Sequence, residues 1–346
     1  MMAPPGAVRP TEESVIMPML SRRRFINISA AAAGLALAPL GRAVALNADV
    51  AVWHGTMLGA TATLKIHHQA RDEAERLIAA ACSEARRLER LFSLYLPDSA
   101  LVELNRTGIL VDPAPELVDL LSDSRRYAEL TDGMFDPTVQ PLWKLYVEHF
   151  SSAGADPSGP PQAAVKAALG HVDYRRMSIR RDRIVLPKGA ELTLNGIAQG
   201  YVTDKVVDLL RSQGIAQSLV DMGETRTIGS RPDGSSWEVG IADPEHPGRI
   251  ETTLRIVDRA VSTSGGYGFR FDPTGRFNHL FDPTNGGCAS LYRSVTTVAS
   301  SATAADALST AFSLMPEAQI RSLLPKTGIE RVHLIDAAGG VSELVA

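Results

Sequence analysis

Hydrophobic and polar positions follow two different periods along this chain of 346 residues. Short runs rich in β-branched and aromatic residues, bounded by turn residues, predict strands over 61–67, 183–186, 218–221, 237–241, 251–257, 277–281, 294–299 and 331–335. Apolar residues spaced by three and four positions predict helices over 72–91, 116–130, 197–212, 303–314 and 317–324. Several strands are joined by turns too short for a helical crossover, which favours antiparallel pairing. The pattern predicts an α+β fold.

The first 45 residues have the order of an export signal. A basic segment around Arg22 and Arg23 precedes an apolar, alanine-rich run over 28–40, and small residues at 43–45 offer a cleavage site. The apolar run is too short to span a bilayer comfortably. The paired arginines are typical of a twin-arginine signal. We expect 1–45 to be a signal peptide and the mature protein to be soluble in the periplasm; the alternative is a basic helix that remains in the folded protein.

Composition narrows the class of protein. With 45% hydrophobic residues the chain can bury a substantial core, so it is not a disordered chain. The formal net charge is −4, and removing 1–45 makes the remainder more acidic. Nucleic-acid binding calls for a basic patch or stripe, so we expect no nucleic-acid partner. Cys82 falls on the apolar side of a helical pattern, and we therefore expect it not to pair with Cys288.

A polar turn and a helix near the C-terminus carry the candidate metal chemistry. Residues 279–287 contain Asp-Pro and Asn-Gly-Gly, which supply the fixed and positive backbone torsions of a turn. On the following helix, Asp306 and Thr310 are four positions apart and project from one face. Such oxygen ligands suit a magnesium ion that also binds a phosphate. For this pair in isolation, the alternative is that Asp306 caps the helix and Thr310 packs.

The rest of the chain resembles the ApbE family of FAD:protein FMN transferases. Seven segments match the family's motifs in order and cover nearly all of the chain after the export signal. They are HGTMLGAT (54–61), LFSLYLPDSALVELN (91–105), DGMFDPTVQPLW (132–143), LTLNGIAQGYVTD (192–204), AVSTSGGY (260–267), HLFDPTNGG (279–287) and ADALSTA (305–311). The resemblance implies one ApbE-like catalytic unit over 46–346, made of two packed subdomains with largely antiparallel sheets.

The resemblance also implies a reaction, the transfer of FMN from FAD to a Thr or Ser hydroxyl of a partner protein with release of AMP. Asp306 and Thr310 match the family's side-chain ligands of Mg²⁺, and the backbone carbonyl ligand falls on Gly196. His279 is the candidate for proton transfer, because histidine titrates near neutral pH and this one lies beside the expected phosphate site. A structural histidine bonded to its own turn is the alternative. Asp282 either orients His279 or caps the Asp-Pro-Thr turn.

The expected FAD contacts come from further segments of the same resemblance. Tyr95 matches an aromatic residue that stacks on a flat ring of the ligand. Residues 263–265 are small, which lets the backbone approach a phosphate closely. For each, a core or turn role is the alternative, above all for Phe135. The complete set is His54, Tyr95, Met134, Phe135, Asp136, Thr193, Gln199, Thr263, Ser264 and Gly265.

The chain departs from the family where charged groups are usual. Thr193 stands in place of a frequent aspartate and Gln199 in place of a frequent lysine, while Gly223-Glu224-Thr225 replaces Gly-Gly-Asp. Exchange of a charge pair for neutral hydrogen-bonding groups can preserve packing. These sequence variations, together with the twin-arginine signal, resemble the NosX branch of the family. The acceptor implied for that branch is the flavin-carrying membrane regulator of nitrous oxide reduction.

Three functions remain open from the sequence. The first is magnesium-dependent FMN transfer to a partner flavoprotein with a short motif similar to S/T-G-A-T. The second is hydrolysis of FAD to FMN and AMP at the same metal site. The third, from a different class, is a non-catalytic flavin-binding or carrier protein in the periplasm. The retained Asp306 and Thr310 argue against pure binding, whereas Thr193 and Gln199 argue for altered chemistry.

Overall fold

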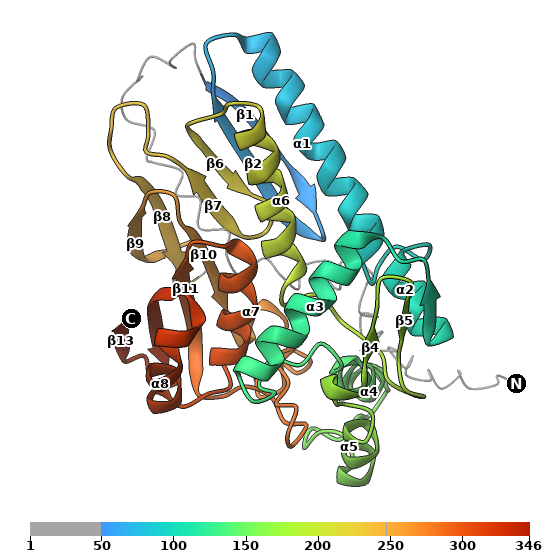
Figure 1. Cartoon of the computed structure of the whole chain (residues 1–346). Coiled ribbons are helices and arrows are strands. Elements are labelled where there is room, and N and C mark those ends of the chain that lie inside the picture. Colours follow the sequence, from blue (N-terminus) through green and yellow to red (C-terminus); the bar gives the residue numbers. More distant parts are fainter. Residues whose placement is uncertain (1–49, 247) are drawn as a thin grey trace, which may run out of the picture.

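An eight-stranded antiparallel sheet forms the centre of the molecule (Figure 1). The computed structural model describes residues 50–346 except 247, so the expected signal peptide at 1–45 lies outside the described residues. The strand order is β1-β2-β6-β7-β10-β11-β12-β13. The strands are β1 (Val50–Met57), β2 (Ala60–His67), β6 (Ser218–Asp221), β7 (Thr225–Ile228), β10 (Ala260–Ser264), β11 (Tyr292–Ala299), β12 (Ile329–Asp336) and β13 (Val341–Val345).

Three helices pack together on one side of this sheet: α1 (Arg71–Phe92), α6 (Ala198–Ser212) and α7 (Ala302–Phe312) (Figure 1). Helix α1 forms because its apolar residues recur as one stripe, and that stripe is buried. Cys82 belongs to the stripe, and both it and Cys288 are free, as expected. Helix α7 is buried almost throughout, which places its polar side chains inside the molecule.

Most of the other helices and a small three-stranded sheet build a second region beside the large sheet, whereas the last helix (Glu317–Thr327) and a two-stranded hairpin within 237–256 pack on the large sheet itself (Figure 1). A small sheet of order β3-β5-β4 and a separate hairpin β8-β9 complete the strands. The bounds are α2 (Ala100–Thr107), β3 (Ile109–Val111), α3 (Pro115–Leu130), α4 (Gln140–Ser151), α5 (Gln162–Leu169), β4 (Ser178–Ile179), β5 (Arg183–Val185), β8 (Trp237–Ala242), β9 (Ile250–Ile256) and α8 (Glu317–Thr327).

The α+β prediction with largely antiparallel sheets is confirmed, and the five predicted helices are present with small shifts at their ends. The strand predicted over 277–281 is wrong. That segment makes only isolated bridges, between Arg270 and Asn278 and between Phe281 and Cys288. Its aromatic residues instead pack into a cluster with Tyr146 of α4. The β-rich composition therefore reflected core packing rather than pairing in a sheet.

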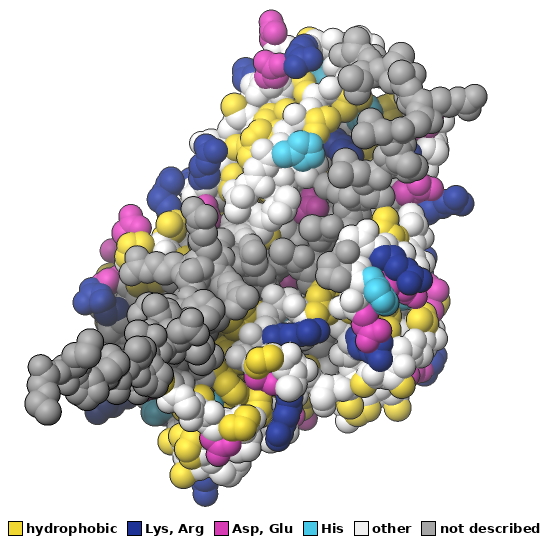
Figure 2. Space-filling model, turned by 180° about the vertical axis from the view of Figure 1, so that it is seen from behind, with side chains coloured by type: hydrophobic (Ala, Val, Ile, Leu, Met, Phe, Trp, Pro, Cys, Tyr) yellow, Lys and Arg dark blue, Asp and Glu magenta, His cyan; other side chains and the backbone are white. Residues whose placement is uncertain are grey.

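Charges of both signs are interspersed over the coloured part of the face in Figure 2, which is the reverse of the view in Figure 1. No helix within the described residues is long and apolar enough to cross a membrane. Within residues 50–346, 247 excepted, three apolar clusters lie inside, the largest between the eight-stranded sheet and the helices that cover it.

Candidate functional site

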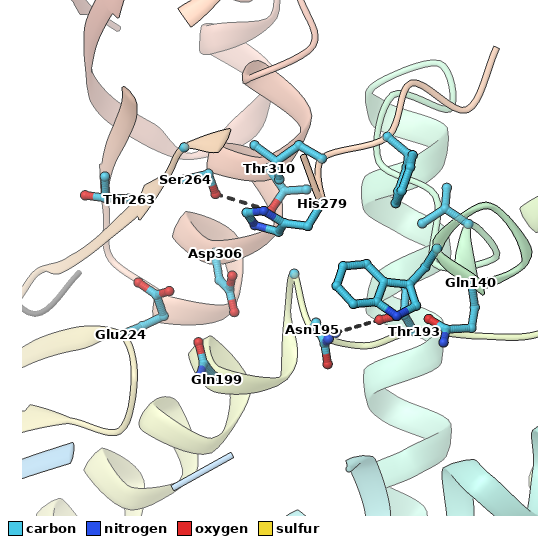
Figure 3. Close-up of a pocket in the computed structure, with 16 residues that line it drawn as sticks. Gln140, Thr193, Asn195, Gln199, Glu224, Thr263, Ser264, His279, Asp306 and Thr310 are labelled. Atoms are coloured by element: carbon cyan, nitrogen blue, oxygen red, sulfur yellow. Dashed lines mark hydrogen bonds between the residues drawn. The ribbon is translucent and has the colours of Figure 1, made fainter. Parts of the chain in front are cut away.

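A pocket lies where the start of α6, the end of β10, helix α7, the segment after Phe277 and the start of α4 meet (Figure 3). Its empty volume is about 690 Å³, including solvent at its mouth. It brings together most of the residues that the sequence proposed for the metal, the proton transfer and the phosphates. The lining is Val139, Gln140, Trp143, Thr193, Asn195, Gly196, Gln199, Glu224, Thr263, Ser264, Gly265, His279, Leu280, Phe281, Asp306 and Thr310.

The N-terminus of α7 is held by a carboxylate from α6. Asp204 Oδ2 accepts hydrogen bonds from Ser301 Oγ at 2.8 Å, from Thr303 N at 2.9 Å and from Thr303 Oγ1 at 2.7 Å. Its Oδ1 accepts from Ala302 N at 2.9 Å and pairs with Arg226. A carboxylate at a helix N-terminus satisfies free N–H groups and complements the helix dipole. Asp204 therefore fixes the helix that carries Asp306 and Thr310.

Helices α6 and α7 approach closely at Gly200. A Cβ on this residue would lie 2.3 Å from Ala302 O and 2.8 Å from Asp306 Cβ, so only glycine fits. The Gly200 N–H donates to Asp306 Oδ2 at 2.9 Å, which orients the carboxylate. Asp306 is buried, and burial raises its pKa to about 7.

The three residues proposed as magnesium ligands line the same pocket. A Cβ built on Gly196 would lie 3.0 Å from Thr310 Oγ1, so the Gly196 backbone is next to the Thr310 hydroxyl. Asp306 is one helical turn before Thr310, and all three residues line the same pocket. A carboxylate, a hydroxyl and a carbonyl are the hard ligands that Mg²⁺ takes in proteins. The residues present therefore fit a magnesium ion.

Glu224 is a pocket residue that the sequence did not propose. Its side chain is buried, its Oε2 has no hydrogen-bond partner, and the same is true of Gln199 Nε2. Burial raises the pKa of Glu224 well above its usual range, with repulsion from Asp306 as a further cause. The replacement of Gly-Gly-Asp at 223–225 was visible in the sequence, but only the chain reversal between β6 and β7 places Glu224 beside α7. Unpartnered polar atoms in a pocket are free to bind water or a polar ligand.

His279 lines the pocket, where burial lowers its pKa to about 4. Its Nδ1 lies 3.4 Å from Phe269 O, and because a carbonyl only accepts, Nδ1 carries the proton and Nε2 is an acceptor. Asp282 is not among the pocket residues. Its Oδ1 accepts from Thr284 N at 2.8 Å and Thr284 Oγ1 at 2.6 Å, which is the capping alternative.

A second hollow adjoins the pocket on the side of α4. Its lining shares Gln140, Trp143 and Asn195 with the pocket, and Tyr95 faces it from the loop after α1. Tyr95 Oη accepts from Asn195 Nδ2 at 3.2 Å, and the side chain is 41% exposed, so an aromatic ring is open to a ligand. Trp143 supplies a second ring that the sequence did not single out, because its place depends on how α4 packs.

Four proposed FAD contacts lie outside this lining: His54, Met134, Phe135 and Asp136. His54 is exposed on β1, with Nδ1 3.1 Å from Thr63 Oγ1, while Leu58 at the end of the same hairpin reaches a small hollow beside Tyr95 and Gln199. Phe135 is in the core, and Asp136 accepts hydrogen bonds from Thr138 in its own turn and from the backbone N–H of Tyr174 in a distant segment. The structure gives these two a packing or turn role.

The fold and the pocket define an α+β protein in which a pocket lined by oxygen-bearing side chains adjoins a hollow lined by Tyr95 and Trp143. The model of the ApbE family matches residues 58–333, and the chain belongs to that family. A FAD:protein FMN transferase of Treponema pallidum is 32% identical over 250 residues, which cover 64% of this chain and 67% of that protein. The protein of that name from Escherichia coli K12 is 27% identical over 262 residues, covering 72% and 74%.

Solved structures agree with this assignment. The crystal structure of the ApbE protein from Thermotoga maritima has a TM-score of 0.75 and 27% identity, and the match covers 85% of this chain and 96% of that one. The apo form of the Pseudomonas stutzeri flavinyl transferase ApbE gives a TM-score of 0.70 and 28% identity, covering 86% and 94%.

The buried acids predict how stability depends on pH without a bound cation. Asp306 and Glu224 have pKa values raised above those of an unfolded chain, so the native state binds more protons and stability falls as pH rises through the native values. The lowered pKa of His279 acts oppositely, but only below its unfolded value of about 6.5. We expect the melting temperature to fall between pH 6.5 and 8.5, and to fall less in Asp306→Asn. An equal fall in both proteins, measured by calorimetry in chelator, would contradict the assignment.

Proposed function

We propose that this protein transfers FMN from FAD to a Thr or Ser hydroxyl of a partner flavoprotein, with magnesium as cofactor and AMP as the second product. One observation carries the proposal: Asp306, Thr310 and Gly196 meet in one pocket with His279, beside a hollow with open aromatic rings, in a chain of the ApbE family. The names of the relatives support the flavin-transfer reaction.

The charge of the pocket supports a requirement for a cation. Two of its residues, Asp306 and Glu224, are carboxylic acids, and among the described residues of the lining none is Lys or Arg. A pyrophosphate is itself anionic, so its binding there needs positive charge from elsewhere. Asp306, Thr310 and Gly196 would hold Mg²⁺, which supplies that charge when bound.

Side chains of this protein are available for proton transfer, for stacking of the flat rings and for the phosphates. The acceptor oxygen forms a bond to the FMN phosphorus, the bond from that phosphorus to the oxygen of AMP breaks, and AMP departs with this oxygen. The hydroxyl proton passes to Nε2 of His279, which is neutral and an acceptor in the pocket. The rings of Tyr95 and Trp143 offer flat surfaces for the flavin or adenine. Small residues at 263–265 leave space for the phosphates.

The test is a balance between two products. Purified protein is incubated with FAD, Mg²⁺ and a partner flavoprotein that carries an S/T-G-A-T-like motif. We expect one FMN added to the acceptor, seen in its mass, and one AMP released for each flavin attached. The control is the same acceptor with the Thr or Ser of the motif changed to alanine, which should yield neither product.

Two other results would each replace the proposal. AMP and free FMN without labelled acceptor would show FAD hydrolysis, with water in place of the hydroxyl. Tight FAD binding with neither product would show a flavin carrier, a result that Gln199 in place of a lysine would then explain. The flavin-carrying membrane regulator of nitrous oxide reduction is the acceptor to try first, because the spelling of 192–201 and 219–224 resembles the NosX branch.

We propose that the reaction takes place in the periplasm, after export through the twin-arginine pathway. The paired Arg22 and Arg23 before an apolar run support this location. Replacement of both by lysine is expected to retain the precursor in the cytoplasm, whereas wild type is cleaved after Ala45. Fractionation with immunoblotting measures both forms. A processed periplasmic product from the double variant would reject this route.

A further inference from the structure

A chain of hydroxyl groups leads from the pocket wall, where Ser264 and Thr310 are half-buried, into the interior behind it. Its centre is Ser309 on α7, whose side chain is fully buried. Ser309 Oγ lies 2.9 Å from Asp306 O, 2.7 Å from Ser264 Oγ and 3.2 Å from Ser262 Oγ. Ser264 Oγ in turn lies 3.4 Å from Thr310 Oγ1, the contact at the pocket wall in Figure 3. Ser309 itself does not line the pocket.

The backbone carbonyl of Asp306 fixes the direction of the hydrogen bonds in this chain of hydroxyl groups. A hydroxyl has a single proton to donate, and a carbonyl oxygen can only accept. Ser309 therefore donates to Asp306 O, and its contact with Ser264 requires Ser264 to donate. With its only proton directed at Ser309, Ser264 can act toward Thr310 only as an acceptor.

We infer that Ser309 is a positioning residue that fixes which way the Thr310 hydroxyl presents itself. Thr310 directs its proton to Ser264, and the lone pairs of its oxygen are left for the pocket, as a cation ligand requires. Without Ser309, the Ser264 hydroxyl is free to donate to Thr310, which then turns its own proton toward the pocket. This inference rests on the proposed role of Thr310 as a ligand.

The residue that caps the C-terminus of α7 offers a matched control. Ser313 is one turn further along, is also buried, and its Oγ donates to Ser309 O at 2.8 Å. Ser313→Ala and Ser309→Ala therefore each remove a buried hydroxyl that donates to a helix carbonyl. Both variants lose one such hydrogen bond, and Ser309→Ala also loses the contacts with Ser262 and Ser264, so it should lower the melting temperature at least as much as Ser313→Ala. Only Ser309 is joined to Ser264.

The experiment measures binding of Mn²⁺ alone, by electron paramagnetic resonance of the free ion, to the purified protein without FAD. We expect Ser309→Ala to weaken binding about fivefold, which is the scale of one ordinary hydrogen bond, and Ser313→Ala to leave it unchanged. Thr310→Ala should also weaken binding, and the double variant Ser309→Ala/Thr310→Ala should bind no more weakly than Thr310→Ala. Such non-additivity shows that Ser309 acts through Thr310.

Each other outcome decides a specific point. Wild-type affinity in Ser309→Ala, with weakened binding in Thr310→Ala, overturns the inference and leaves the metal site intact. Additive losses in the double variant also overturn it. If neither Asp306→Ala nor Thr310→Ala affects Mn²⁺ binding, the metal site and the inference both fail. Ser264→Ala repeats the test should Ser309→Ala not fold, because it removes the acceptor of the Thr310 proton and leaves α7 unchanged; unaltered binding there counts against the inference.

Discussion

Replacement of Asp306 by alanine is expected to lower magnesium-dependent FMN transfer by roughly a thousandfold, the scale of losing the several kcal/mol that a bound metal ion supplies. Asp306 is the one anionic group among the three proposed ligands, and the Gly200 N–H orients it. Burial raises the pKa of Asp306, so its charge does not stabilise the fold, and we expect Asp306→Ala to remain folded although the Gly200 N–H loses its acceptor. Transfer is measured as FMN-labelled acceptor against Mg²⁺ concentration.

The control for this variant is Asp208→Ala, which removes an exposed acid from helix α6. It should keep the wild-type rate and the wild-type magnesium dependence. Thr310→Ala is expected to retain more activity than Asp306→Ala, because it removes a neutral ligand. Unchanged magnesium dependence in Asp306→Ala would show that the cation binds elsewhere or is not required.

Local patterns predicted what depends on a single segment. The periodicity of apolar residues located α1 and α6, because in each of them one face is buried against the rest of the core. The spacing of Asp306 and Thr310 was enough to place both on one face of α7, and the structure puts both in the pocket. Motif order then related this pair to Gly196 and His279, which no spacing rule could have done.

Contacts between segments distant along the chain could not be predicted from local sequence patterns. Glu224 joins the pocket because the chain reverses between β6 and β7, and Trp143 borders it because α4 packs on an aromatic cluster. His54 was chosen from the start of its motif, yet in the hairpin it is Leu58, at the other end, that lies toward Tyr95. In the sequence Ser309 is only a small polar residue within a predicted helix. The structure shows that its hydroxyl contacts Ser264 and the Asp306 carbonyl.

Asp204→Ala is expected to destabilise the protein by about 3–5 kcal/mol, the usual cost of removing one partner of a buried ion pair. Asp204 and Arg226 expose only 14% and 12% of their side chains, so the variant leaves a largely buried guanidinium without its carboxylate. It also removes the acceptor for Ala302 N and Thr303 N at the start of α7. Denaturant unfolding measures the free energy of unfolding.

Asp204→Asn separates the two contributions. The amide oxygen still accepts one of the N–H groups at the start of α7, but the charge opposite Arg226 is lost. We expect Asp204→Asn to lose less stability than Asp204→Ala. Mn²⁺ binding should also be weakened less in Asp204→Asn than in Asp204→Ala, although Asp204 is not part of the pocket lining. Wild-type stability in Asp204→Ala would disprove the anchoring role. Full destabilisation with unchanged Mn²⁺ affinity in the folded fraction would show that the ligands on α7 keep their positions without this anchor.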